Sequence, residues 1–263
     1  MTTPAMHTAA TGMVTQETRT EVIANNLANV DTTGFKRSIP HFEDLLYQSL
    51  QAPSVLAGSD TDTAPAIQVG RGTRLASTQR IDTQGPLQET DRDLDVAISG
   101  DGYFQVQLGS GSTAYTRDGS LQISDQGTLV TSDGLQIIPG IKIPSDVTSL
   151  NISATGIVSG TKGQAGTTVE LGRIELARFP NPSGLQSLGQ NLLVETPTSG
   201  QPTVGYPQDE GLGQLVSGQL EGSNVQIVQE MVDMISAQRA YELNSKAVKT
   251  ADEMAQTATQ MVQ

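Results

Sequence analysis

Proline is confined to the middle of this chain, which leaves a long segment at each end free to form a helix. The sequence holds 12 prolines in 263 residues, yet none lies between Pro4 and Pro40 and none follows Pro207. Proline lacks a backbone donor and clashes with the preceding turn, so it is rarely tolerated inside a helix. We therefore expect helices at both ends and a different kind of structure between them.

The C-terminal segment carries apolar residues at helical spacing. Ser223 or Asn224 can cap a helix just after Gly222, the last glycine of the chain. The apolar stripe comprises Val225, Val228, Val232 and Ile235, and after a break at Gln238 and Arg239 it resumes with Ala240, Leu243, Ala247, Ala251, Met254, Ala258 and Met261. Spacings of three and four residues predict one apolar face. We expect the alanine-rich seam of Leu243, Ala247, Ala251, Met254 and Ala258 to face a close helical neighbour.

The N-terminal segment shows a similar but weaker pattern. Its apolar positions are Met6, Ala9, Met13, Ile23, Leu27 and Val30. Gly34 is expected to end this helix as a left-handed cap, with Phe35 packing back on the last turn. Neither helix can bury its stripe alone, so the two are expected to pair and to contact other subunits. A helical hairpin packed on a sheet within one globule is the alternative.

Between the helices the pattern changes to short alternating runs. Strands are expected at residues 96–98, 103–108, 113–117, 121–124, 129–132, 135–138, 149–153 and 169–179, the last with a bulge at Gly172. Asp-Gly and Gln-Gly pairs between the runs predict a β-meander, and the Gly-Ser repeat at 109–112 a hairpin tip. The sequence thus indicates an α+β fold. Residues 1–33 and 222–263 are expected to form a helical assembly core, 34–92 and 195–221 a connecting region with an extended arm, and 93–194 a β-rich outer domain.

Charge and cysteine content exclude several classes of function. The net charge is −13, most of it in the middle of the chain, and no Lys/Arg-rich run occurs, so a nucleic-acid partner is not expected. The absence of cysteine rules out disulfides and thiolate metal sites. The first 20 residues do not form an ordinary secretory signal, and no stretch reaches the roughly 18 apolar residues of a membrane span, so no membrane insertion is expected.

The chemically suggestive side chains form no known catalytic motif. Only His7 and His41 are present, and no zinc-binding spacing can be built from them. The cluster of Asp91, Arg92, Asp93 and Asp95 lacks the regular oxygen-ligand spacing and central glycine of a calcium loop and is interpreted as a solvated acidic turn. Paired carboxylates need no motif, so a hydrolase stays a minor alternative. We expect no catalytic, cofactor-binding or metal-binding residues, and thus no enzyme.

Three collinear segments resemble the flagellar rod and hook protein family. Residues 25–37 (NNLANVDTTGFKR) are similar to its N-terminal signature; 94–98 (LDVAI), 102–104 (GYF) and 115–119 (YTRDG) to its β-domain entry; and 221–225 (EGSNV), 234–235 (MI) and 238–244 (QRAYELN) to its C-terminal signature. The residues to which the resemblance gives an assembly role are Asn25, Asn26, Leu27, Asn29, Gly34, Phe35, Lys36, Ser223, Asn224, Val225, Gln238, Arg239, Ala240, Tyr241 and Asn244. The opening residues lack the bulky apolar start expected of the family.

The resemblance implies a structural subunit that polymerises helically outside the inner membrane. Residues 42–47 (FEDLLY) and 68–73 (QVGRGT) resemble the branch that forms the distal rod, the drive shaft that carries torque from motor to hook around an export channel. The implied location is the periplasmic rod reaching the outer membrane. Implied partners are further copies of the chain, proximal rod proteins, the hook protein, the basal-body rings and the flagellar export apparatus. A proximal-rod or hook-type subunit, or a secreted β-rich glycan-binding or hydrolytic domain, is the alternative.

Overall fold

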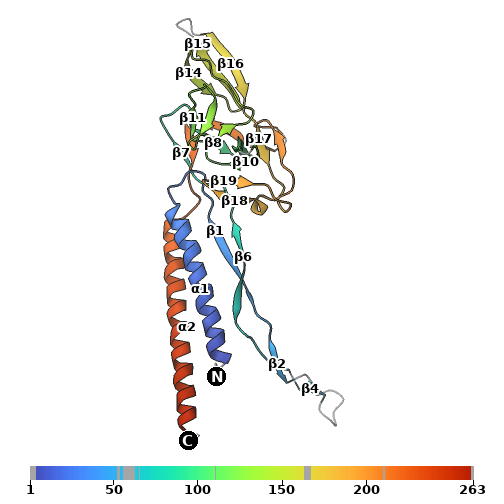
Figure 1. Cartoon of the computed structure of the whole chain (residues 1–263), viewed down its shortest axis with the longest axis vertical. Helices are drawn as coiled ribbons and strands as arrows, with labels where there is room; N and C mark the ends of the chain where they lie inside the picture. The colour runs from blue at the N-terminus through green and yellow to red at the C-terminus, as the bar shows by residue number, and fades with distance from the viewer. Residues whose placement is uncertain are drawn as a thin grey trace. The chain divides into compact units, whose positions relative to one another are not determined.

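The computed structural model describes residues 4–51, 54–55, 63–64, 66–109, 111–162, 167–209 and 211–261. The chain divides into two compact units, one within residues Met1–Leu27, Ser38–Gln79 and Ile227–Gln263 and the other within Ala28–Arg37 and Arg80–Gln226 (Figure 1). The first unit holds two paired helices and a β-ribbon, and the second is built of antiparallel sheets. The predicted α+β class, with paired terminal helices and a β-rich middle, is confirmed.

The helices α1 (Pro4–Ala28) and α2 (Ile227–Met261) pack together with opposite chain directions. Asn26 near the end of α1 meets Glu230 near the start of α2, whereas Gly12 lies against Asn244. Pro4 occupies the first helical position, where its missing N–H has no intrahelical partner to lose. None of the helices in the described part of the chain is both long and apolar enough to cross a membrane.

Two expected helix boundaries were wrong. Helix α1 ends at Ala28, so Gly34 is not its cap, although Gly34 does adopt a left-handed conformation with φ of 70° in the turn that follows. Helix α2 begins at Ile227, which leaves Val225 outside it, and it runs without a break through Gln238 and Arg239. Gly34, Ser223 and Asn224, from which the helix boundaries were predicted, therefore lie in the connecting segments outside the helices.

Helix α2 has two faces of opposite character. The buried positions Glu230, Ala237 and Ala251, with the half-buried Asn244 between them, recur every seven residues and form a polar and small face. The large apolar side chains Val228, Val232, Ile235, Leu243 and Met254 are exposed. Most of the predicted apolar stripe therefore lies on the side of α2 that α1 does not cover. We call this the outer face of α2.

A two-stranded ribbon completes the first unit. Its ladders pair β1 (Ser38–Asp44) with β6 (Thr73–Arg80), β2 (Gln48–Gln51) with β5 (Ile67–Val69), and β3 (Ser54–Val55) with β4 (Thr63–Ala64). The ribbon occupies the position expected of the extended arm, of which residues 52–53, 56–62 and 65 lie outside the described residues. Leu46, Tyr47 and Leu50 are exposed on it.

The second unit is organised around one sheet with the order β11-β12-β13-β9-β10-β19-β18, to which β17 and β20 are added beside β9. Smaller ladders are β14-β15-β16, β8-β21 and β7-β22. The bounds are β7 (Leu87–Glu89), β8 (Val96–Ser99), β9 (Tyr103–Gln107), β10 (Thr113–Thr116), β11 (Leu121–Ile123), β12 (Leu129–Thr131), β13 (Gln136–Ile137), β14 (Val147–Ile152), β15 (Ile157–Lys162), β16 (Thr167–Arg173), β17 (Leu176–Arg178), the 3-10 turn η1 (Pro182–Gly184), β18 (Gln186–Gly189), β19 (Leu192–Val194), β20 (Thr203–Gly205), β21 (Gln214–Ser217) and β22 (Gln219–Glu221). Phe104, Ile98, Leu121, Leu129 and Leu176 are fully buried in its core.

The predicted meander is present over β11, β12 and β13, which pair in sequence order. It does not extend to residues 113–117 as expected, because β10 pairs with β9 and β19 and not with β11. The hairpin between β9 and β10 turns at the Gly-Ser repeat, of which Ser110 lies outside the described residues. The expected strand 169–179 is two strands, β16 and β17. The pairing register of β16 shifts at Leu171, next to the predicted bulge at Gly172. An added Cβ at Gly172 would lie 3.0 Å from the Ile141 side chain, so Ile141 packs directly against the backbone of the bulge.

Candidate assembly site

Polar contacts fill the interface between α1 and α2. Asn26 Nδ2 donates to Glu230 Oε2 at 3.3 Å and to the Ser38 carbonyl at 2.9 Å, and Asn26 Oδ1 accepts from the Ser38 N–H. Arg19 and Asp233 form an ion pair at 3.1 Å. Polar groups at buried positions pair well in only one arrangement, so they specify the register of the two helices while contributing less apolar burial than leucine would.

The outer face of α2 presents a shallow apolar hollow of about 430 Å³. Val232, Ile235, Ala240 and Leu243 line it together with Arg239. The side chain of Ile235 is 47% exposed and that of Leu243 is 65% exposed. Large apolar residues grouped on an exposed face of this kind are typical of a surface that is covered by another protein.

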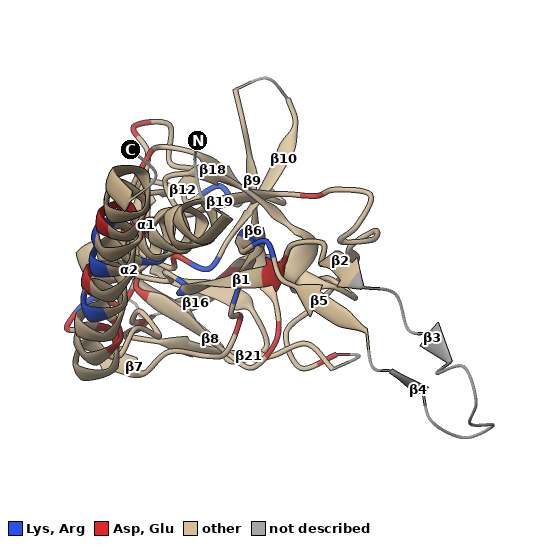
Figure 2. Cartoon of the chain, turned by 90° about the horizontal axis from the view of Figure 1, so that it is seen from below, with Lys and Arg blue, Asp and Glu red and all other residues tan. Residues whose placement is uncertain are grey.

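Charged residues of both signs accompany this apolar face along α2. Figure 2 shows blue and red segments interleaved on the helix, which carries Arg239, Glu242, Lys246, Lys249 and Asp252 within 14 residues. Alternating charge gives no single-sign field of the kind that binds nucleic acid. It suits lateral contacts in which the charges of neighbouring helices can complement one another.

The residues of the two family signatures fall into two groups in the structure. Gln238, Arg239 and Tyr241 are exposed on α2, where a second molecule can reach them. Asn26, Gly34, Lys36, Ser223 and Val225 are buried, and the rest are half-buried or, like Asn25, exposed. Of the seam residues only Ala251 is buried, whereas Leu243, Ala247, Met254 and Ala258 are exposed. The signatures therefore mix surface positions with positions that act inside one subunit.

The second unit contains a buried cluster of ionised side chains that sequence reasoning missed. Glu221 Oε1 accepts from Lys36 Nζ at 2.5 Å and from the Gly85 N–H at 2.9 Å, while Glu221 Oε2 lies 3.0 Å from Arg117 Nη1. The three side chains are 0%, 4% and 6% exposed, in the order Glu221, Lys36, Arg117. Both Glu221 and Arg117 lie inside the family-like segments, but no local pattern links residues 104 positions apart.

Burial and the neighbouring charges shift the pKa values of Glu221 and Lys36 in opposite directions. Burial alone would raise the pKa of Glu221, but the charges of Arg117 and Lys36 and the hydrogen bonds from Lys36 and Gly85 outweigh it and hold the pKa below its usual range. Burial lowers the pKa of Lys36, and the attraction of Glu221 offsets only part of that effect. Glu221 therefore stays ionised, and its stabilising contribution is present at neutral pH and is lost as the pH falls through its lowered folded-state pKa.

Asn224 ties the same region together through its side chain. Its Oδ1 accepts from the Arg37 N–H at 2.8 Å, and its Nδ2 donates to the carbonyls of Ile81 at 2.8 Å and Thr83 at 3.0 Å. The Lys36 ammonium donates to the same Thr83 carbonyl at 2.7 Å. The amide of Asn224 thus satisfies backbone groups of two segments that have no ladder partner there.

The side chains that an enzyme would need do not converge. His7 and His41 are both exposed, and the ring of His41 contacts Gln79. Asp93 is exposed, as expected of a solvated acidic turn. That expectation was wrong for Asp95, which is buried and whose Oδ1 lies 3.5 Å from Arg92 Nη1. Within the described ranges, no group of three or more His, Asp or Glu side chains is placed to hold a metal ion.

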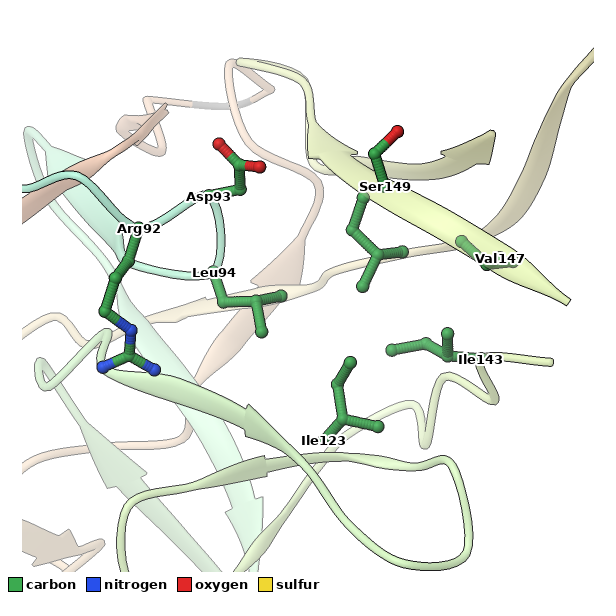
Figure 3. Close-up of a pocket in the computed structure, with 8 residues that line it drawn as sticks. Arg92, Asp93, Leu94, Ile123, Ile143, Val147 and Ser149 are labelled. Carbon is green, nitrogen blue, oxygen red and sulfur yellow. The ribbon is translucent and has the colours of Figure 1, made fainter. Parts of the chain in front are cut away.

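The hollow beside this turn is apolar at its centre. It measures about 350 Å³, and Figure 3 shows Leu94, Ile123 and Ile143 directed toward one another across it. Asp93 and Ser149 point away from its centre (Figure 3). The carboxylate of Asp93 therefore lies at the rim of this hollow and not at its centre.

Three family models match separate parts of the chain. Residues 6–36 match the model of the flagella basal body rod protein, residues 97–160 that of the flagellar hook protein FlgE/F/G D1 domain, and residues 216–261 that of the flagellar basal body rod FlgEFG protein C-terminal region. The flagellar basal-body rod protein FlgG of Borreliella burgdorferi is 49% identical over 252 residues, 95% of each chain. The chain belongs to the FlgG family of flagellar basal-body rod proteins.

Two relatives from one organism differ in their sequence identity to this chain. FlgG of Bacillus subtilis is 39% identical over 257 residues, 96% of each chain. The flagellar hook-basal body complex protein FlhP of the same organism is 30% identical over 264 residues, 95% of this chain and 96% of that one. The sequence-based expectation of a distal-rod subunit is confirmed, as is that of a structural, non-enzymatic protein of the flagellar basal body.

Ala251, the buried residue of the seam, gives a direct test of the helix pair. We expect Ala251→Phe to destabilise the pair by about 1–3 kcal/mol, because a phenyl ring overpacks a contact that admits only a methyl group. Ala258→Phe, an exposed change on the same helix, should stay within about 0.5 kcal/mol. Thermal melting followed by helical circular dichroism measures both. If both variants melted at the same temperature, Ala251 would not lie in the helix contact.

Proposed function

We propose that this chain polymerises into a helical tube, the distal rod, through contacts made by the outer face of α2. The observation that carries the proposal is the distribution of side chains on that helix. Small and polar residues face α1, whereas Val228, Val232, Ile235 and Leu243 stay exposed in the single subunit. A helix with its large apolar side chains outward gains the burial of those side chains only when a neighbouring subunit covers them.

A repeated contact of this kind produces a filament. Each subunit offers the same helix pair, and a contact between two different surfaces of identical subunits continues indefinitely if the rotation does not close. Burying a leucine, isoleucine or valine side chain stabilises by roughly 1.5–3 kcal/mol each, so a few such residues suffice to drive association at every contact. The register-setting polar contacts between α1 and α2 give every subunit the same shape.

The proposed rod has the helix pairs inside, around the export channel, and the acidic β-rich units outside. The ribbon, with Leu46, Tyr47 and Leu50 exposed, serves as an arm onto neighbouring subunits and so resists bending. Proximal rod proteins and the hook protein adjoin the two ends of the rod, the basal-body rings surround it, and the export apparatus delivers the subunits. The rod carries torque through the periplasm toward the outer membrane.

Polymerisation of the purified full chain tests this function. Sedimentation and electron microscopy over rising protein concentration should reveal tubes or filaments above a threshold concentration, because addition at a repeated interface is a mass-action process. A compact monomer that persists to millimolar concentration would contradict the proposal. Circular dichroism of the same samples verifies that the monomer is folded.

A further inference from the structure

The connecting segments of the two helices are held side by side in the second unit. We call residues 29–37, which follow α1, and residues 222–226, which precede α2, the stems. The Gly34 N–H donates to the Glu221 carbonyl at 2.8 Å, the Asn224 N–H to the Phe35 carbonyl at 3.4 Å, and the Arg37 N–H to Asn224 Oδ1 at 2.8 Å. Since the stems are covalently continuous with α1 and α2, holding the stems together constrains the end of α1 and the start of α2.

Two glycines allow the stems to approach other backbone closely. A Cβ at Gly34 would lie 2.9 Å from the carbonyl carbon of Arg117, and its φ of 70° is a conformation that other residues rarely adopt. A Cβ at Gly85 would lie 2.0 Å from the Gly222 carbonyl oxygen. The stems therefore lie directly against the segments that carry Arg117 and the Gly85 N–H, both of which bind Glu221.

The buried charge of Glu221 is satisfied in only one arrangement of these segments. The carboxylate of Glu221 is fully buried and takes one donor from the first stem (Lys36), one from residue 85 and one from residue 117. A buried charge is costly unless all its partners are in place, so the cluster is favourable only when three remote segments meet in one register. Apolar side chains in the same place would tolerate a shift of a stem by a residue, because their contacts are not directional.

We propose that Glu221, Lys36 and Arg117 form an intrachain clasp that locks the two stems together and thereby sets the register in which α1 and α2 pair. These three side chains are positioning residues: they act on the helix pair through the stems and are out of reach of a second subunit. Polymerisation needs the same helix register in every subunit, and the clasp provides it. This consequence for rod assembly rests on the proposed function.

The test uses Glu221→Gln in the full chain, below the concentration at which subunits associate. Hydrogen exchange should become at least about tenfold faster at the amides of Gly34, Arg37 and Gly85, which depend on the clasp, and stay unchanged at Val106 in the core of the sheet. Asp146→Asn is the matched control, since it removes a carboxylate from the exposed pair with Lys162. Unchanged exchange at the stem amides would overturn the proposal.

Helix register is measured separately with a cysteine pair, because the chain has none of its own. A Cβ added at Gly12 would lie 3.2 Å from Cγ of Asn244, so Gly12→Cys and Asn244→Cys place two thiols next to one another for disulfide cross-linking. Oxidation should cross-link the pair in the parent chain, and Glu221→Gln should lower the yield several-fold. An equal yield in both backgrounds would overturn the register role.

A second variant is available in case the first does not fold. If Glu221→Gln fails to fold, Lys36→Met carries the same test, since it leaves the Glu221–Arg117 pair in place, and unchanged stem exchange in that variant again overturns the clasp. Both readouts are taken on the monomer. A chain that never polymerises would thus refute the proposed function while the exchange and cross-linking data still decide on the clasp.

Discussion

A chain that carries both Ile235→Asp and Leu243→Asp is expected to fold as a monomer and to lose polymerisation. Both side chains are exposed in the single subunit, so their replacement changes its stability little. In the rod each subunit would lose two apolar contacts worth roughly 1.5–3 kcal/mol apiece. The concentration needed for polymerisation should rise at least about 100-fold, since about 1.4 kcal/mol corresponds to a factor of ten.

Sedimentation over a concentration series measures this effect. The matched control is Ile123→Asp with Val204→Asp, two apolar residues of the β-rich unit that are 45% and 46% exposed. The control chain should polymerise at nearly the parental concentration. If the α2 variant assembled as readily as the control, the outer face of α2 would not be the contact surface.

Gly119→Ala is expected to destabilise the β-rich unit by at least about 3 kcal/mol, more than most single substitutions do. A Cβ at Gly119 would lie 1.7 Å from the Val96 carbonyl oxygen, which is far inside van der Waals contact. The neighbouring backbone cannot move aside cheaply, because the Val96 N–H donates to the Gly119 carbonyl at 3.0 Å and Val96 is fully buried. The melting temperature should fall by at least about 6 °C.

Gly109→Ala provides the control for this change. Gly109 lies at the tip of the hairpin between β9 and β10, and an added Cβ there meets nothing within 4 Å. Differential scanning calorimetry should give Gly109→Ala a melting temperature close to that of the parent chain. If Gly119→Ala melted at the same temperature as Gly109→Ala, the turn would accept a side chain at residue 119 without loss of stability.

Local patterns predicted the elements of the fold but not their partners. The gap in proline at each end and the spacing of Leu243 and Ala251 indicated both helices, and Gln126-Gly127 and Asp133-Gly134 indicated the meander of β11, β12 and β13. Helix ends were missed because Gly34 and Asn224 serve contacts of the connecting segments and not caps. The apolar stripe on α2 was found, but its period cannot tell which partner covers it, and α1 packs on the other side.

The buried cluster could not be predicted from sequence because its members come from segments far apart in the chain. Lys36 and Glu221 are separated by 185 positions, and each alone is typical of an exposed surface residue. The family-like segments contain all three charged residues, yet a resemblance does not distinguish a contact between subunits from one inside a subunit. Because Gly34, Lys36 and Glu221 are buried in the single subunit, their contacts lie within one chain.

The central claim, that the outer face of α2 is buried between subunits in the rod, is tested most directly by thiol labelling. The cysteine-free chain allows a single thiol at Leu243→Cys, with Val204→Cys in the β-rich unit as the reference. Both thiols should react at similar rates in the monomer. After polymerisation, labelling at residue 243 should slow at least about tenfold while labelling at residue 204 changes little. Equal labelling of residue 243 in monomer and polymer would contradict the account.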